Sequence, residues 1–301
     1  MSKFSFNDLK PYLTQGNIVW IGLFLLPLII TIFLFFWQDN DDYSHLGNAS
    51  YTSGNSVERC ANGSRPGESG ASYGEKTAEG IKFNVRTPLN YDSSVAHPLI
   101  VVYAPAGANR RKMEKKSDLT YAATTAGFII AYADHPELST TSTIELSTIP
   151  ALVAKKWCVD QQRIYLTGHS DGGTVSMAIS FMTGTKHIPT AIAASAAGID
   201  TASLESHRCP APLSVMIMHS AKDRLFPGFG LKSTGWWADC NDCELIPDKL
   251  DNGCIVYRGC DNGVETWYCE GNKIHSQWPG LNKEIIAFFS SIKKRSLSLM
   301  K

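Results

Sequence analysis

The segment that most constrains the fold of this chain is Gly168-His169-Ser170-Asp171-Gly172, which matches the pattern G-x-S-x-G. The apolar run 164–167 before it predicts a strand, and residues 174–182 after it predict a helix. A serine in this context sits on a sharp strand-to-helix turn, where Gly168 and Gly172 let the backbone pass without a Cβ clash. The pattern alone recurs by chance, but between these flanks it predicts an exposed serine nucleophile.

Alternating strand and helix patterns surround this turn. Strands are predicted at 81–85, 98–103, 128–132, 164–167, 191–195 and 213–218, with a late pair at 255–257 and 264–268. Helices are predicted at 119–126, 148–157, 174–182 and 281–292. Such alternation predicts an α/β fold, with a mostly parallel, doubly wound sheet and helices on both faces.

A serine nucleophile needs a base, and the base needs a carboxylate that orients it. In a fold with this strand–serine–helix turn, the chain order is Ser, then Asp or Glu, then His. Asp223 follows the predicted strand 213–218, where a doubly wound sheet collects functional residues. His275 is the only histidine after Asp223. The sequence therefore predicts Ser170, Asp223 and His275 as a catalytic triad.

Three other carboxylates and one other histidine are weaker candidates. Asp171 is adjacent to the nucleophile, Asp200 precedes the strand expected to carry the acid, and Glu265 is too close in sequence to His275. His219 is the next candidate for the base if His275 is not used.

An oxyanion hole for this chemistry needs two backbone N–H groups. One is expected from Asp171, the residue after the nucleophile, and the other from the loop after strand 98–103. In that loop Pro105 has no N–H, so Ala106 is the predicted second donor.

The N-terminal part contains an apolar run of membrane-spanning length. Residues 18–37 carry no charge, Lys3 and Lys10 precede them, and several aspartates follow. About 20 apolar residues cross a hydrocarbon core, and positive charge before the span places the N-terminus in the cytoplasm. We expect an uncleaved signal anchor with the catalytic domain periplasmic or extracellular. A cleaved signal peptide and a buried helix remain as alternatives.

These observations divide the chain into four predicted segments: a cytoplasmic tail at 1–17, a transmembrane helix at 18–37, a flexible linker at 38–77 and the catalytic domain at 78–301. The linker prediction depends on a composition rich in Gly, Ser, Asn and Asp. Lys and Arg total 28, as do Asp and Glu, so no basic excess favours nucleic acid as a partner. Nothing in the sequence indicates the oligomeric state.

All eight cysteines follow the apolar run, and five lie between residues 240 and 269. An even number at this density predicts disulfides formed in an oxidising compartment. The alternative is zinc, because Cys240-x-x-Cys243 has ligand spacing. The spacing alone leaves the disulfide connectivity open.

Residues 78–292 resemble the polyhydroxybutyrate depolymerase and feruloyl esterase group of secreted α/β-hydrolases. The most specific stretch is 158–173, which joins Cys158-x-Asp-x-x-Arg163 to the G-x-S-x-G turn; 98–102, 218–223 and 275–280 also correspond. The resemblance implies one catalytic domain with the α/β-hydrolase fold. It also implies hydrolysis of polyhydroxyalkanoate-like or feruloyl-like esters through an acyl-serine, with no cofactor and no metal. Cys243 with Cys260 is the disulfide that it implies.

The chain departs from this group at two places. The group usually has His-Gly in the oxyanion loop, where this chain has Ala104-Pro105, and Gly before the catalytic histidine, where this chain has Ile274. These changes bear on substrate and rate rather than on the triad. A catalytically weakened binding module is one alternative function, which the altered oxyanion loop would permit. A serine peptidase is the other, because the same triad can cleave amides.

Overall fold

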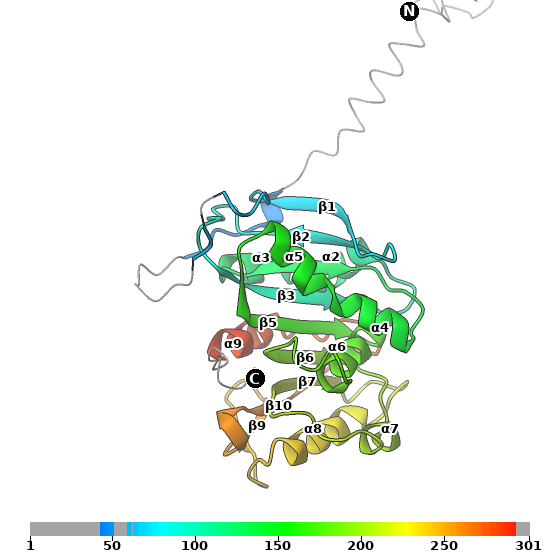
Figure 1. Cartoon of the computed structure of the whole chain (residues 1–301). Helices are drawn as coiled ribbons and strands as arrows, with labels where there is room; N and C mark the ends of the chain where they lie inside the picture. The colour runs from blue at the N-terminus through cyan, green and yellow to red at the C-terminus, as the bar shows by residue number, and fades with distance from the viewer. Residues whose placement is uncertain (1–42, 51–58, 62, 293–301) are drawn as a thin grey trace, which may run out of the picture. The chain divides into compact units, whose positions relative to one another are not determined.

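The computed structural model describes residues 43–50, 59–61 and 63–292. Their centre is a ten-stranded sheet with the order β1-β2-β4-β3-β5-β6-β7-β10-β9-β8 (Figure 1). The six middle strands, from β4 to β10, are parallel, and the pairs at both edges are antiparallel. The prediction of a mostly parallel sheet is confirmed.

The strands are β1 (Ala71–Lys76), β2 (Lys82–Arg86), β3 (His97–Tyr103), β4 (Ile129–Ala133), β5 (Val159–His169), β6 (Ala191–Ser195), β7 (Ser214–Ser220), β8 (Asp248–Lys249), β9 (Ile255–Tyr257) and β10 (Thr266–Gly271). The predicted late pair is β9 and β10, which are antiparallel to each other. β10 also continues the parallel sheet beside β7.

The helices are α2 (Arg110–Ser117), α3 (Thr120–Thr125), α4 (Thr140–Ser147), α5 (Ile149–Lys156), α6 (Asp171–Phe181), α7 (Thr201–Glu205), α8 (Phe229–Cys240) and α9 (Asn282–Ser291). Helices α2, α3 and α9 lie on one face of the sheet, and α4 to α8 lie on the other (Figure 1). Their side chains form two core clusters with the sheet, one on each face. All seven residues of β3 are buried because helices cover both faces of this strand.

Strand register brings three central strands to one point. Gly168 of β5 lies opposite Tyr103 of β3 on one side and Ala194 of β6 on the other. The next pair along β5 and β6 is His169 with Ser195. The carboxyl ends of β3, β5 and β6 therefore meet where β5 passes into α6, which is where a doubly wound sheet holds its functional groups.

The predicted linker is wrong for its described part. β1 starts at Ala71 and pairs with β2, so the sheet begins before residue 78. Leu46 and Ala49 are buried, and Cys60 is bonded to Cys158 at the start of β5. Gly and Ser are common in mobile linkers, but here the burial of Leu46 and Ala49 and a disulfide hold the described part of this segment against the domain.

The predicted transmembrane helix at 18–37 and cytoplasmic tail at 1–17 lie outside the described residues. Among the residues that the structure describes, no helix has the length and apolar character needed to cross a membrane.

All eight cysteines form disulfides, which confirms that part of the cysteine prediction. The pairs are Cys60–Cys158, Cys209–Cys240, Cys243–Cys260 and Cys254–Cys269. The zinc alternative for Cys240 and Cys243 is wrong because each is bonded to a different cysteine. The pair Cys243–Cys260 is the one that the family resemblance implies.

Candidate active site

The nucleophile turn has the strained backbone that its sequence pattern predicts. Ser170 has φ 54° and ψ −118°, a region that costs a residue with a side chain roughly 1–3 kcal/mol. A Cβ at Gly172 would lie 2.0 Å from the carbonyl oxygen of Tyr103, and one at Gly168 would lie 2.4 Å from the backbone of Gly172. Only glycine therefore allows β5, α6 and the end of β3 to approach this closely.

Ser170, His275 and Asp223 form a continuous chain of hydrogen bonds. His275 Nε2 lies 2.9 Å from Ser170 Oγ, and His275 Nδ1 lies 2.7 Å from Asp223 Oδ2. Ser170 lies at the start of α6, Asp223 lies in the loop after β7, and His275 lies in the loop before α9. This arrangement lets the imidazole take a proton from the serine while the carboxylate orients the ring.

Asp223 is held as a carboxylate. Its side chain is buried, which acts to raise the pKa, but hydrogen bonds from His275 and from the N–H groups of Leu225 and Phe226 outweigh burial and lower it. The two N–H groups bind Oδ1, so Oδ2 is aimed at His275. A negative charge in this position stabilises the imidazolium that forms when His275 accepts a proton.

His219, the reserve candidate for the base, has a different role. Its Nε2 donates a hydrogen bond to the carbonyl oxygen of Phe226, at 2.8 Å, and lies 3.5 Å from Asp223 Oδ2. Burial lowers the pKa of His219, partly offset by Asp223. His219 therefore supports the loop that carries the acid.

The other carboxylate candidates lie elsewhere. Asp200 caps α7, accepting from the N–H of Ser203, and Glu265 pairs with Arg258. The side chain of Asp171 binds His135 Nε2 at 2.9 Å. The interaction of Asp171 with His135 was not foreseen, because His135 follows β4 and no local pattern relates the two.

The predicted oxyanion donors occupy neighbouring ends of β3 and α6. Asp171 is the first residue of α6, whose N-terminus carries partial positive charge. Ala106 is exposed in the turn after β3, and the carbonyl oxygens of Tyr103 and Ala104 approach Gly172 closely. The assignment of Ala106 and Asp171 as the donors stays a prediction.

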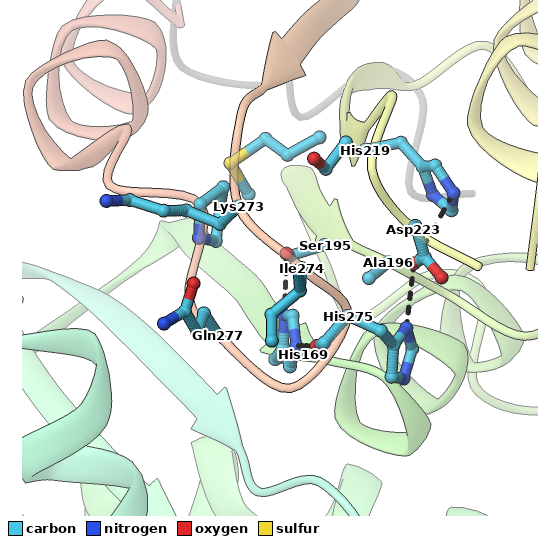
Figure 2. A pocket seen from close by; sticks show the side chains of 12 residues that line it. His169, Ser195, Ala196, His219, Asp223, Lys273, Ile274, His275 and Gln277 are labelled. Atoms are coloured by element: carbon cyan, nitrogen blue, oxygen red, sulfur yellow. Dashed lines mark hydrogen bonds and ion pairs between the residues drawn. The ribbon is translucent and has the colours of Figure 1, made fainter. Parts of the chain in front are cut away.

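Figure 2 shows a small pocket beside His275. It is lined by residues at the ends of β6 and β7 and by the loop that carries His275. His169 and Ser195 belong to this pocket and bond to each other. The Phe226 ring packs edge-on against His275, with centroids 5.0 Å apart. The sequence did not predict these roles, because His169 meets Ser195 and the His275 carbonyl, and Phe226 meets the His275 ring, across long stretches of chain. In the described ranges, no group of three or more His, Cys, Asp or Glu side chains is arranged to hold a metal ion.

Comparison with known proteins relates this domain to others by structure alone. No protein-family model matches the chain, and no curated protein matches its sequence. An acetyl xylan esterase from Aspergillus awamori superposes with a TM-score of 0.56 at 14% identity, covering 73% of this chain and 98% of the esterase.

Two further solved structures are similar to this domain. A ferulic acid esterase from Anaeromyces mucronatus has a TM-score of 0.51 at 15% identity, over 81% of this chain and 97% of its own. An S-formylglutathione hydrolase from Staphylococcus aureus has a TM-score of 0.53 at 11% identity, over 73% and 99%. Together with the strand order and the strained serine turn, these likenesses show that the described domain has an α/β-hydrolase fold.

Proposed function

We propose that this protein is a serine esterase that hydrolyses carboxylic esters through an acyl-serine intermediate. The observation that carries the proposal is the hydrogen-bonded chain Ser170–His275–Asp223 at the carboxyl end of a parallel sheet. Its serine sits on a turn whose backbone strain has no other evident use.

In the first half-reaction, Ser170 Oγ attacks the ester carbonyl carbon while His275 Nε2 takes the hydroxyl proton. The negative charge that develops on the carbonyl oxygen is received by the N–H groups of Asp171 and Ala106. When the tetrahedral intermediate collapses, the bond to the alcohol oxygen breaks and His275 returns the proton to it. The alcohol leaves, and the acyl group stays on Ser170.

In the second half-reaction, water replaces the alcohol. The water oxygen attacks the acyl carbon while His275 takes a proton from the water, which forms a second tetrahedral intermediate. Collapse of this intermediate breaks the bond between the acyl carbon and Ser170 Oγ. The carboxylic acid leaves, and His275 gives its proton back to the serine. Asp223 keeps the imidazole in the tautomer with Nδ1 protonated throughout both halves.

The substrate class that we propose is a polyhydroxyalkanoate-like or feruloyl-like ester. The sequence resemblance favours this class, and the names of two structural neighbours, an acetyl xylan esterase and a ferulic acid esterase, agree with an ester substrate. Panels of p-nitrophenyl esters, feruloyl esters, hydroxybutyrate oligomers and peptides test it. Faster cleavage of the peptides would indicate a peptidase instead.

Substitutions in the triad test the mechanism. In a well-studied triad, loss of the serine or the histidine costs about 10⁶ in kcat, and the losses do not add. Ser170→Ala and His275→Ala should therefore be about equally slow, with a double variant scarcely slower. Wild type should be labelled by a fluorophosphonate at Ser170. A folded His275→Ala variant with a tenth or more of wild-type kcat contradicts the base assignment, and absence of labelling favours a binding module.

We also propose that the domain is tethered to a membrane and faces the periplasm or the exterior. The uncharged run 18–37 and the four disulfides support this. The full chain should stay in the membrane fraction after carbonate washing, whereas a chain without residues 1–38 should be released. A mature protein that begins near residue 50 would refute the anchor.

A further inference from the structure

We propose that His169 is a positioning residue for the catalytic base, and that Ser195 holds the His169 ring in place. His169 Nε2 lies 2.6 Å from the carbonyl oxygen of His275, and His169 Nδ1 lies 2.9 Å from Ser195 Oγ (Figure 2). The inference rests on the proposed function, because it assigns a role only if His275 is the base.

The loop that carries His275 needs support from outside itself. It runs from the end of β10 to the start of α9, and residues 272–274, 276 and 277 are exposed. Two side chains bond to its backbone next to the base: His169 to the carbonyl of His275 itself and Lys116 Nζ to that of Ser276, at 2.8 Å. Of these two, His169 is the buried one, so its position is determined by the core.

The partners of His169 determine which nitrogen carries its proton. His169 is 2% exposed, and burial lowers its pKa to about 4, although the hydrogen bond to the His275 carbonyl acts to raise it, so the ring is neutral near pH 7. A neutral imidazole has one N–H, and the carbonyl oxygen of His275 can only accept. The proton is therefore on Nε2, and Nδ1 accepts from the hydroxyl of Ser195.

Ser195 also holds the nucleophile. Its carbonyl oxygen accepts a hydrogen bond from the N–H of Ser170, at 2.9 Å. The same oxygen would lie 2.4 Å from a Cβ at Gly173, so α6 starts directly against it. Ser195 thus contacts the serine through its backbone and the histidine loop through His169. One residue at the end of β6 sets the position of Ser170 relative to His275.

The distance between the two reacting atoms depends on how Ser170 and His275 are positioned relative to each other. Ser170 Oγ and His275 Nε2 are 2.9 Å apart, within hydrogen-bond range. A misplacement of about 1 Å at a catalytic group can slow a reaction about 100-fold. Without the donor at His169, the His275 ring keeps Ser170 and Asp223 as partners, but the His275 carbonyl loses its side-chain partner.

Four variants test the proposal, with kcat, KM and the rate of fluorophosphonate labelling of Ser170 as readouts. His169→Phe keeps a ring of similar size but no donor, and kcat should fall about 10- to 100-fold with KM changed less than about twofold. His169→Gln places an amide N–H where Nε2 was, and it should recover most of the loss. Ser195→Ala should slow kcat about fivefold, because Nδ1 of the buried His169 ring loses its hydrogen-bond donor. Ser180→Ala, which removes another buried hydroxyl far along α6, is the matched control and should be unchanged.

A double variant separates positioning from general damage. Because the Ser195 side chain acts through His169, adding Ser195→Ala to His169→Phe should slow the reaction no further. The proposal is overturned if folded His169→Phe has wild-type kcat, if His169→Gln is as slow as His169→Phe, or if the two losses multiply. If His169→Phe does not fold, the comparison of Ser195→Ala with Ser180→Ala decides. A wild-type protein that neither hydrolyses esters nor is labelled at Ser170 overturns the proposed function as well.

Discussion

Replacing Gly172 by alanine should damage both the stability and the activity of this protein. An added Cβ would lie 2.0 Å from the carbonyl oxygen of Tyr103 and 3.1 Å from that of Ala104. Real Cβ atoms do not approach such atoms closer than 3.0 Å, so α6 and β3 must separate by about 1 Å. β3 is held between β4 and β5 and is buried along its whole length, so the start of α6 has to move.

The expected losses of stability and of activity follow from this displacement. Overpacking of a filled core costs about 1–3 kcal/mol and occasionally more, and a clash with backbone belongs at the upper end of that range. If the helix start moves about 1 Å, Ser170 moves with it, and kcat should fall about 100-fold. Urea unfolding and ester-hydrolysis kinetics measure the two effects.

Gly235→Ala is the matched control. Gly235 lies inside α8 with nothing within 4 Å of an added Cβ, so alanine there should raise the free energy of unfolding by roughly 0.5–1 kcal/mol. The steric argument is refuted if Gly172→Ala changes the free energy of unfolding by less than about 0.5 kcal/mol, the range of ordinary surface substitutions, and leaves kcat unchanged.

Two further predictions concern stability. Because burial lowers the pKa of His169 to about 4 from 6.5, the unfolded chain binds a proton between these values that the folded chain does not. The free energy of unfolding should therefore fall by about 3 kcal/mol as the pH drops from about 6.5 to about 4, and His169→Gln should flatten that part of the profile; equal urea-unfolding profiles for wild type and variant would contradict this. Replacing both cysteines of Cys60–Cys158, which are 98 residues apart, should cost about 4.7 kcal/mol, against about 3 kcal/mol for Cys243–Cys260, which are 17 apart. The reverse order in urea unfolding would show that chain entropy does not determine these losses.

The sequence predicted the strands and helices whose apolar residues form a clear local pattern. β3, β4, β6 and β7 are continuous apolar runs because they are covered on both faces. The helix predicted at 281–292 is α9, in which Ile285, Phe288 and Phe289 are buried.

Elements with a weak apolar pattern were missed. α2 has the sequence RRKMEKKS and buries only Met113 and Ser117, so it lacks an apolar stripe. β1 is an edge strand, half-exposed and interrupted by Gly74, and it is recognisable only from its pairing with β2. α4 is rich in Ser and Thr, which single-segment propensities do not assign to a helix.

The sequence by itself determined the nucleophile turn and the order of Ser170, Asp223 and His275. A strained turn requires glycines at set spacings, and a parallel sheet brings residues after successive strands to one edge. Only the tertiary structure decided the cysteine pairs other than Cys243–Cys260, where Asp171 binds, and that His169 reaches the His275 carbonyl across 106 positions of chain. Such contacts depend on strand register and loop path, which follow from packing of the whole domain and leave no mark in neighbouring residues.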